Sequence, residues 1–86
     1  MILQVFAVYD IKARAYMSPF FMPNREMAVR AFSTGVNEEK SELNKHPADF
    51  TLFHIGAFDD ETGNLEPLQN HFSLGLASQY RVRKDD

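Results

Sequence analysis

The sequence predicts a small α+β domain, in which a three-stranded, mostly antiparallel sheet carries one main helix on one face. Three observations predict this fold. Residues 2–9 and 50–58 are rich in β-branched and aromatic side chains, and residues 24–36 between them have the apolar spacing of a helix. A polar turn over residues 59–64 then leads into a further apolar run, as in a β-hairpin. The predicted chain order is strand, long loop, helix and hairpin, and the order of strands within the sheet stays open.

The chain has the length of one domain, 86 residues. We expect residues 1–80 to form that domain and residues 81–86 to be a charged, disordered tail. No apolar run approaches the roughly 18 residues that a membrane span needs, and the first residues lack the basic start of a signal peptide. Cysteine is absent, which excludes disulfides and thiolate metal sites and agrees with a reducing compartment. These features predict a soluble protein that is not exported and has no membrane partner.

Residues 2–9 predict the first strand, because neither Gly nor Pro interrupts their β-branched and aromatic side chains. Both faces of this strand are nearly apolar, so we expect it to be central and covered on both sides. Residues 10–23 show no clear period and are predicted to be a long loop. Pro19 and Pro23 enclose three large apolar residues in this loop, and loops of this length are often functional.

The helix is predicted to begin after Asn24, a favoured N-cap residue, with Glu26 in the first turn, where a negative charge suits the helix dipole. It is expected to end near Val36, because residues 33–35 are weak helix formers. The core-facing positions recur at i, i+3, i+4, i+7 and i+8, and they are Ala28, Ala31, Phe32, Gly35 and Val36. Residues 37–47 are polar and predict a surface loop or a short helix capped by Asn37.

Residues 50–58 predict the second strand, and Gly63 or Asn64 is expected to take a positive φ in the turn that follows. Residues 65–68 predict a short third strand. Pro67 has no N–H for a strand ladder, so this strand should lie at an edge of the sheet. Residues 69–80 are expected to pack as irregular structure or as a short strand.

The charge is distributed unevenly along the chain. The net charge is −3, which argues against a general nucleic-acid coat protein. Residues 1–34 hold four basic and two acidic residues, a balance of +2, whereas residues 35–80 hold two basic and eight acidic residues, a balance of −6. The first third of the chain is therefore the part that is suited to meet phosphate.

No pattern of catalytic or cofactor-binding residues is present. The sequence contains no nucleophile elbow, phosphate-binding glycine loop or dinucleotide fingerprint. His46, His54 and His71 lack the spacing and the cysteine partners of a metal site, and His54 is expected to be a structural or surface histidine within its strand. The acidic residues 59–61 lack the alternating oxygens of a calcium loop and predict a solvated turn. We therefore expect no enzyme, no metal and no cofactor.

An aromatic and basic stretch is the one feature with a functional interpretation. Exposed aromatic rings stack on the bases of single-stranded nucleic acid, while Arg and Lys contact its phosphates. The candidate contact residues are Lys12, Arg14, Tyr16, Phe20, Phe21, Arg25 and Arg30.

Two other interpretations of the same stretch stay open. Phe20 and Phe21 can fold back and seal the sheet while the arginines are solvated, and because so short a chain needs its aromatic residues in the core, we expect at least one of the two to pack inward. Alternatively, the loop over residues 19–23 or a free edge of the sheet binds another protein or a second copy of the chain.

Short sequence blocks in a distinctive order cover most of the chain, from residue 2 to residue 76. After the first strand they are Val8-Tyr9-Asp10, Lys12-Ala13, Ala15-Tyr16, Pro19-Phe20-Phe21-Met22-Pro23, Ala28-Val29-Arg30-Ala31-Phe32, His46-Pro47-Ala48-Asp49-Phe50-Thr51-Leu52-Phe53 and Gly56-Ala57-Phe58-Asp59-Asp60. This set resembles the small nonstructural protein of gokushovirus-type Microviridae, which are tailless single-stranded DNA bacteriophages.

The resemblance implies a non-enzymatic protein of the host bacterial cytoplasm that is absent from the virion and acts in viral DNA replication. Such a factor binds the replication-initiation complex and shifts synthesis from duplex DNA to single-stranded progeny DNA for packaging. The partners implied are single-stranded DNA and phage or host replication proteins, with a homo-oligomer as a further expectation. The resemblance supplies no catalytic or ligand-binding residues.

Overall fold

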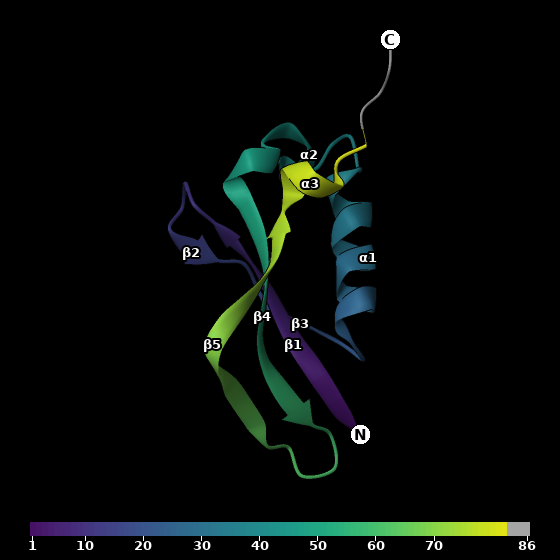
Figure 1. Cartoon of the computed structure of the whole chain (residues 1–86), viewed down its shortest axis with the longest axis vertical. Coiled ribbons are helices and arrows are strands. Elements are labelled where there is room, and N and C mark those ends of the chain that lie inside the picture. Colours follow the sequence, from purple (N-terminus) through teal and green to yellow (C-terminus); the bar gives the residue numbers. More distant parts are fainter. Residues whose placement is uncertain (83–86) are drawn as a thin grey trace.

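The computed structural model describes residues 1–82 and shows an antiparallel sheet with the main helix lying along one face (Figure 1). In chain order the elements are β1 (Ile2–Asp10), β2 (Ala15–Tyr16), β3 (Phe20–Met22), α1 (Arg25–Val36), α2 (Glu42–Lys45), the 3-10 turn η1 (Pro47–Asp49), β4 (Phe50–Asp59), β5 (Leu65–Leu76) and α3 (Ala77–Tyr80).

The sheet has five strands in the order β2-β1-β4-β5, and β3 also pairs with β1. The α+β class is therefore confirmed in its broad form, but the prediction of three strands is wrong. The predicted loop over residues 10–23 contains β2 and β3, which pair one after the other with different parts of the same edge of β1. Strands of two and three residues are too short to show an alternating pattern, which is why the sequence did not reveal them.

The middle of β1 is buried on both faces, as its apolar sequence predicts, but the two faces are covered differently. Phe6 and Val8 point into the core under the helices. On the other face Val5 and Ala7 are almost fully buried although no helix of the described chain lies over them (Figure 1). Side chains from neighbouring strands cover them instead. We call this side of the sheet the outer face.

Helix α1 begins as predicted, because the Oδ1 atom of Asn24 accepts a hydrogen bond from the backbone N–H of Met27 at 2.9 Å. Its buried positions, Ala28, Phe32 and Val36, belong to the predicted stripe. The core joins them to residues of β1, β4 and α3, and consists of Phe6, Val8, Ala28, Phe32, Val36, Phe50, Leu52 and Ala77.

The packing of the helices differs from the prediction of one helix lying on the sheet. Helix α1 contacts α2 and α3 as well as β3 and β4. Helix α2 is capped by Ser41 rather than by Asn37, and Leu43 packs against the core. Asn37 ends α1, and its Oδ1 atom accepts a hydrogen bond from the backbone N–H of Val82 at 2.7 Å. The tail that was predicted to be disordered also includes residues 83–86, and these lie outside the described part of the chain.

Strand β4 and the turn after it match the prediction, and Gly63 has a φ of +78° in that turn. Strand β5 lies at the edge of the sheet, as Pro67 indicates, but it extends through Leu76 instead of ending at residue 68. Of the two alternatives predicted for residues 69–80, residues 69–76 follow the strand, as a continuation of β5 rather than as a separate short strand. Polar residues at 69–71 hide the strand in the sequence because they interrupt its apolar pattern.

A large bulge in β5 explains those polar residues. The pairs on either side of it are His54↔Phe72 and Gly56↔Pro67, so β4 advances two residues while β5 advances five. Residues 68–71 therefore have no pairing partners in β4. Beside the bulge, β4 and β5 approach so closely that a Cβ atom added to Gly56 would lie 2.7 Å from the backbone oxygen of Glu66.

Candidate nucleic-acid interface

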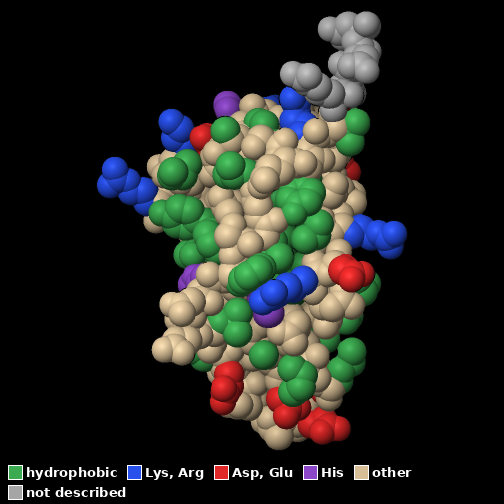
Figure 2. All heavy atoms as spheres, in the orientation of Figure 1, with side chains coloured by type: hydrophobic (Ala, Val, Ile, Leu, Met, Phe, Trp, Pro, Cys, Tyr) green, Lys and Arg blue, Asp and Glu red, His purple; other side chains and the backbone are tan. Residues whose placement is uncertain are grey.

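The seven candidate residues do not form one patch. Lys12 and Arg14 lie in the turn between β1 and β2, Tyr16 is in β2, Phe20 and Phe21 are in β3, and Arg25 and Arg30 are on α1. Helix α1 lies on the side of the sheet opposite the outer face, so its two arginines are separated from the aromatic residues of that face. Figure 2 shows the blue basic side chains at separate places on the surface.

Phe20 and Phe21 point to opposite sides of the sheet, as consecutive residues of a strand do. Phe20 is half-buried, stacks on Phe6 with 5.8 Å between the ring centroids and packs against the core. Phe21 is 45% exposed and contacts Phe58 on the outer face, with 5.5 Å between the ring centroids. Phe20 is therefore a core residue, whereas Phe21 remains accessible to a ligand.

Four aromatic side chains, Tyr9, Tyr16, Phe53 and His71, form a cluster on the outer face. The ring centroids of Tyr9 and Tyr16 lie 4.9 Å apart, and that of Tyr16 lies 5.9 Å from Phe53 and 5.5 Å from His71. All three contacts have the edge-to-face geometry that aromatic pairs favour. We call these four residues the aromatic cluster, and Tyr16 is at its centre.

The contact between Tyr16 and His71 joins the two edges of the sheet. Tyr16 belongs to β2 and His71 to β5, the edge strands on opposite sides, yet the Tyr16 hydroxyl lies 3.0 Å from His71 Nδ1. The bulge in β5 lies immediately before the His54↔Phe72 pair and includes His71. The outer face is consequently a curved, aromatic surface, on which Tyr16 is 43% exposed and His71 is also exposed.

Lys12 and Arg14 place two positive charges beside this cluster. Their turn is held by Asp10, whose Oδ1 atom accepts hydrogen bonds from the backbone N–H groups of Lys12 and Ala13. Arg14 takes a φ of +55°, an uncommon conformation for a residue other than glycine. Both basic side chains are exposed, and within residues 1–82 neither forms a salt bridge. The charges are therefore available to an anionic ligand.

Arg25 has a structural role on the other side of the sheet. Its Nε–H donates a hydrogen bond to His54 Nδ1 at 2.9 Å, and its guanidinium carbon lies 3.9 Å from the centroid of the Phe72 ring. A cation over an aromatic ring is a favourable arrangement. Arg25 therefore links the start of α1 to β4 and β5. Arg30 is exposed farther along the same helix.

His54 is a buried structural histidine, as its position in a strand predicts. It is 5% exposed and stacks on Phe6 with 4.8 Å between the ring centroids. Its Nε2 atom lies 2.8 Å from Gln4 Oε1 and 3.0 Å from the backbone oxygen of Gly56. Nδ1 accepts the bond from Arg25, so Nε2 carries the proton of the neutral ring. Burial lowers the pKa of His54, and the nearby charge of Arg25 lowers it further, against the opposing bond to Gly56.

Sequence reasoning identified Tyr16 but missed the other members of the aromatic cluster. Tyr9 and Phe53 share a face of their predicted strands with residues that were expected to be buried. The sequence therefore gave no indication that these two side chains would be accessible. His71 fell in the segment for which irregular structure and a short strand were both left open. Only the pairing of β5 with β4 brings His71 to Tyr16, 55 residues away in the chain.

Residues 1–82 contain no cluster of three or more His, Cys, Asp or Glu side chains arranged to hold a metal ion. No helix in this part of the chain is long and apolar enough to cross a membrane.

Comparison with known protein families gives a match over most of the chain. The family model described as "Phage ORF5 protein" matches residues 3–80, which is almost the whole chain. No curated protein and no solved structure gives a significant match. The extent of the family match shows that the chain belongs to the phage ORF5 protein family.

Proposed function

We propose that this phage protein is a non-enzymatic accessory factor in viral DNA replication that binds single-stranded DNA through the aromatic cluster and the turn beside it. The observation that carries the proposal is the position of Tyr16. Its exposed ring stands at the centre of four aromatic side chains, two residues after Arg14 and four after Lys12. Single-stranded DNA combines bases that stack on such rings with phosphates that attract such charges.

The expected affinity is modest and depends on salt. Stacking on an aromatic side chain contributes about 1–3 kcal/mol per base and tolerates any base, since each has a π-face. Two basic residues neutralise at most two phosphates, so log K should fall with log salt concentration with a slope of about −1.4. A net charge of −3 agrees with a factor that contacts a short stretch of DNA rather than one that coats it.

Fluorescence anisotropy with a labelled oligothymidylate at low and moderate salt tests the proposal. Wild-type protein should bind with the stated salt dependence, and Tyr16→Ala should bind about tenfold more weakly, as expected from the loss of one stacking contact. Met27→Ala, which alters a half-exposed apolar residue on α1, is the control and should bind like wild type. Absence of binding by wild type, or binding that ignores salt, would refute the DNA contact.

The role in replication rests on the resemblance to the small nonstructural protein of gokushovirus-type Microviridae. In this role the protein acts in the host cytoplasm, outside the virion, and joins single-stranded DNA to the replication-initiation complex. Removing the gene from such a phage should lower the ratio of single-stranded progeny DNA to duplex DNA in infected cells. An unchanged ratio would rule out the switch in synthesis and leave DNA binding to be judged separately.

Self-association is a second candidate function, and the edge position of β5 favours it. An edge strand presents unpaired N–H and C=O groups to which a strand of a second copy can bind. With 12 residues β5 is long for such a strand, although Pro67 and the bulge limit continuous pairing. Light scattering across a concentration series measures the mass directly. A monomer at the highest concentration would exclude this function.

A further inference from the structure

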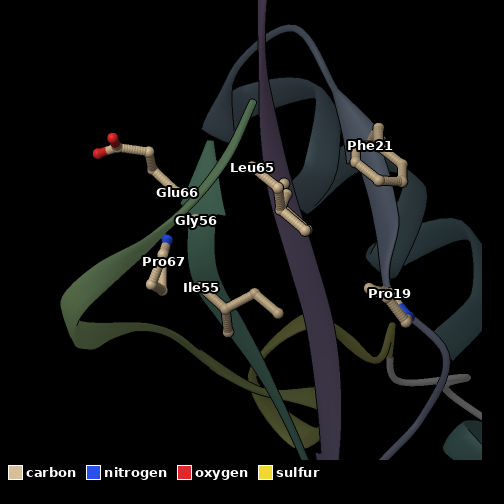
Figure 3. A pocket seen from close by; sticks show the side chains of 8 residues that line it. Pro19, Phe21, Ile55, Gly56, Leu65, Glu66 and Pro67 are labelled. Atoms are coloured by element: carbon tan, nitrogen blue, oxygen red, sulfur yellow. The ribbon is translucent and has the colours of Figure 1, made fainter. Parts of the chain in front are cut away.

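The outer face carries a second aromatic site at the end away from the aromatic cluster. Phe21 and Phe58 contact each other there, with 5.5 Å between their ring centroids, and we call them the aromatic pair. An apolar groove of about 350 Å³ lies beside the pair. The apolar side chains that line it are those of Val5, Pro19, Phe21, Ile55, Leu65 and Pro67. Figure 3 shows Pro19 and Phe21 on one side of β1, with Ile55 and Pro67 on the other. Phe21 is therefore both a member of the pair and a wall of the groove.

The pairing of β2 and β3 with β1 sets the distance between the two aromatic sites. Tyr16 lies opposite Tyr9. Phe21 lies opposite Val5, four positions earlier on β1. At about 3.3 Å per residue this separation is roughly 13 Å. Neighbouring bases in a stacked DNA strand are about 3.4 Å apart, so the same distance corresponds to about four base steps. One strand of about five nucleotides can therefore reach both sites.

The three long strands direct none of their carboxylates to this face. The residues of the Asp, Glu, Lys and Arg types in β1, β4 and β5 are Asp10, Asp59 and Glu66. Their neighbours Tyr9, Phe58 and Leu65 belong to the outer face, so the acidic side chains point to the other side, because side chains alternate along a strand. Glu66 accepts a hydrogen bond from Asn64 Nδ2 at 3.4 Å and lines a separate hollow there. Phosphates that follow the outer face therefore meet no carboxylate of these strands.

The charged turns limit where a strand of DNA can lie on this face. Lys12 and Arg14 supply positive charge at the end of the aromatic cluster. Residues 59–61, in the turn beyond the aromatic pair, are all acidic. The carboxylate of Asp60 is paired with the N-terminal ammonium group at 2.8 Å, but the other two acidic residues keep this turn unfavourable for phosphate. The stretch between the two turns is therefore the part of the face that suits a short strand.

The groove suits the face of a base rather than its hydrogen-bonding edge. Its lining offers no hydrogen-bonding side chain, since the carboxylate of Glu66 points away from it (Figure 3). A base that stacks on Phe21 meets the exposed Leu65 and the buried Val5. Such contacts remove the apolar face of any base from water, so binding here should not depend on the base sequence.

We propose that one DNA strand runs along the outer face from the aromatic cluster to the aromatic pair, with its bases against the sheet and its phosphates in water. This inference rests on the proposed function and extends it from one stacking site to two, which sets a footprint of about five nucleotides. Lys12 and Arg14 hold phosphates at one end of the strand, and a base stacks on Phe21 at the other. Duplex DNA is excluded as a ligand, because its bases are covered by their neighbours and present no free face.

Ligands of equal length and charge test the second site. The first is a labelled octathymidylate, and the other two lack the four bases at one end or at the other while keeping every phosphate. Neither of these two abasic ligands can place bases on both sites. Wild-type protein should therefore bind each of them about tenfold more weakly than the octathymidylate in fluorescence anisotropy. A single site would lose only half of its possible base positions, so a difference of about twofold or less overturns the inference.

Variants of Phe21 separate the aromatic ring from the apolar wall of the groove. Phe21→Leu keeps an apolar side chain and should bind the octathymidylate about tenfold more weakly, whereas Phe21→Tyr keeps the ring and should bind like wild type. Binding of the abasic ligands should change by less than about twofold in Phe21→Leu, since they use one stacking site. Met27→Leu, at an equally exposed position on α1, is the matched control. An equal loss for all three ligands in Phe21→Leu would show a general disturbance of the fold, which overturns the role of Phe21 and with it the inference.

Two further results separate the alternatives. Wild-type protein that binds none of the three ligands refutes the proposed function and this inference together, whereas equal binding of all three refutes the inference alone. Light scattering on wild type and Phe21→Leu shows whether the outer face instead binds a second copy of the chain. A dimer that is present in wild type and lost in Phe21→Leu overturns the inference in favour of self-association, and equal masses support it.

Discussion

The hydroxyl of Tyr16 lies 3.0 Å from Nδ1 of His71, and this contact joins the two edge strands across the outer face of the sheet. A flat sheet holds its edges apart, so the contact requires the curvature that the β5 bulge supplies. The aromatic cluster is thus a product of topology as much as of composition.

Changing Tyr16 to Phe separates the hydrogen bond from the ring. The variant keeps the aromatic contacts and loses only the bond to His71, so the free energy of unfolding should fall by about 0.5–1 kcal/mol. Its affinity for oligothymidylate should stay near that of wild type, because stacking needs the ring and not the hydroxyl. Urea unfolding and anisotropy measure the two effects. If Tyr16→Phe binds DNA as weakly as Tyr16→Ala, the stacking role is wrong.

His54 should make stability depend on pH. Burial holds its pKa in the folded state below the ordinary value of 6.5, so the unfolded state binds the proton more readily. The stability from the neutral, buried ring is complete above pH 6.5 and is lost as the pH falls below that value. Urea midpoints measured from pH 7.5 to pH 5 should therefore decline, and less so in His54→Gln. His46→Gln, at an exposed position after α2, should decline like wild type; a flat wild-type profile would contradict the prediction.

Gly56→Ala should destabilise the hairpin. The added Cβ atom would lie 2.7 Å from the backbone oxygen of Glu66, which can move only if the two strands separate. Overpacking of this kind costs about 1–3 kcal/mol, and thermal unfolding measures the loss. Gly63→Asn is the contrasting change, since Gly63 has open space around it and asparagine tolerates its positive φ. Equal losses in the two variants would contradict the steric explanation.

Arg25→Lys should destabilise the protein although it keeps the charge. Lysine has no Nε–H in the position that bonds His54 and no planar group to lie over Phe72. A loss of about 1–2 kcal/mol is expected, because a buried ring nitrogen loses its partner. Arg30→Lys, on an exposed position of the same helix, should change the melting temperature little. If the two substitutions behave alike, the link from α1 to the sheet contributes nothing to stability.

The sequence predicted those elements whose signals are local. Asn24 as N-cap, the stripe from Ala28 to Val36, β4 and the Gly63 turn all depend on residues close together in the chain, and each agrees with the structure. Pro67 placed β5 at the edge for an equally local reason, the missing N–H.

The parts of the structure that the sequence did not predict depend on pairing between segments that are distant in the chain. Strands β2 and β3 have regular structure only because β1 offers an edge, and β5 is a strand through residues 69–71 only because β4 holds both of its ends. The candidate site shows the same division. Exposure of Phe21 and burial of Phe20 follow from the register of β3 on β1, which no periodicity in three residues specifies.

The bulge in β5 also makes the hairpin tolerant of changes in length. An insertion in a regular strand reverses the facing of every later residue, and one between Val5 and Val8 would turn the core residues of β1 outward. Residues 68–71 are already unpaired with β4. The pairs on either side of them, Gly56↔Pro67 and His54↔Phe72, are fixed separately. One residue more or fewer there leaves both registers as they are and changes only how far His71 reaches toward Tyr16. Evolution can therefore reshape the outer face at this point without disturbing the core beneath it.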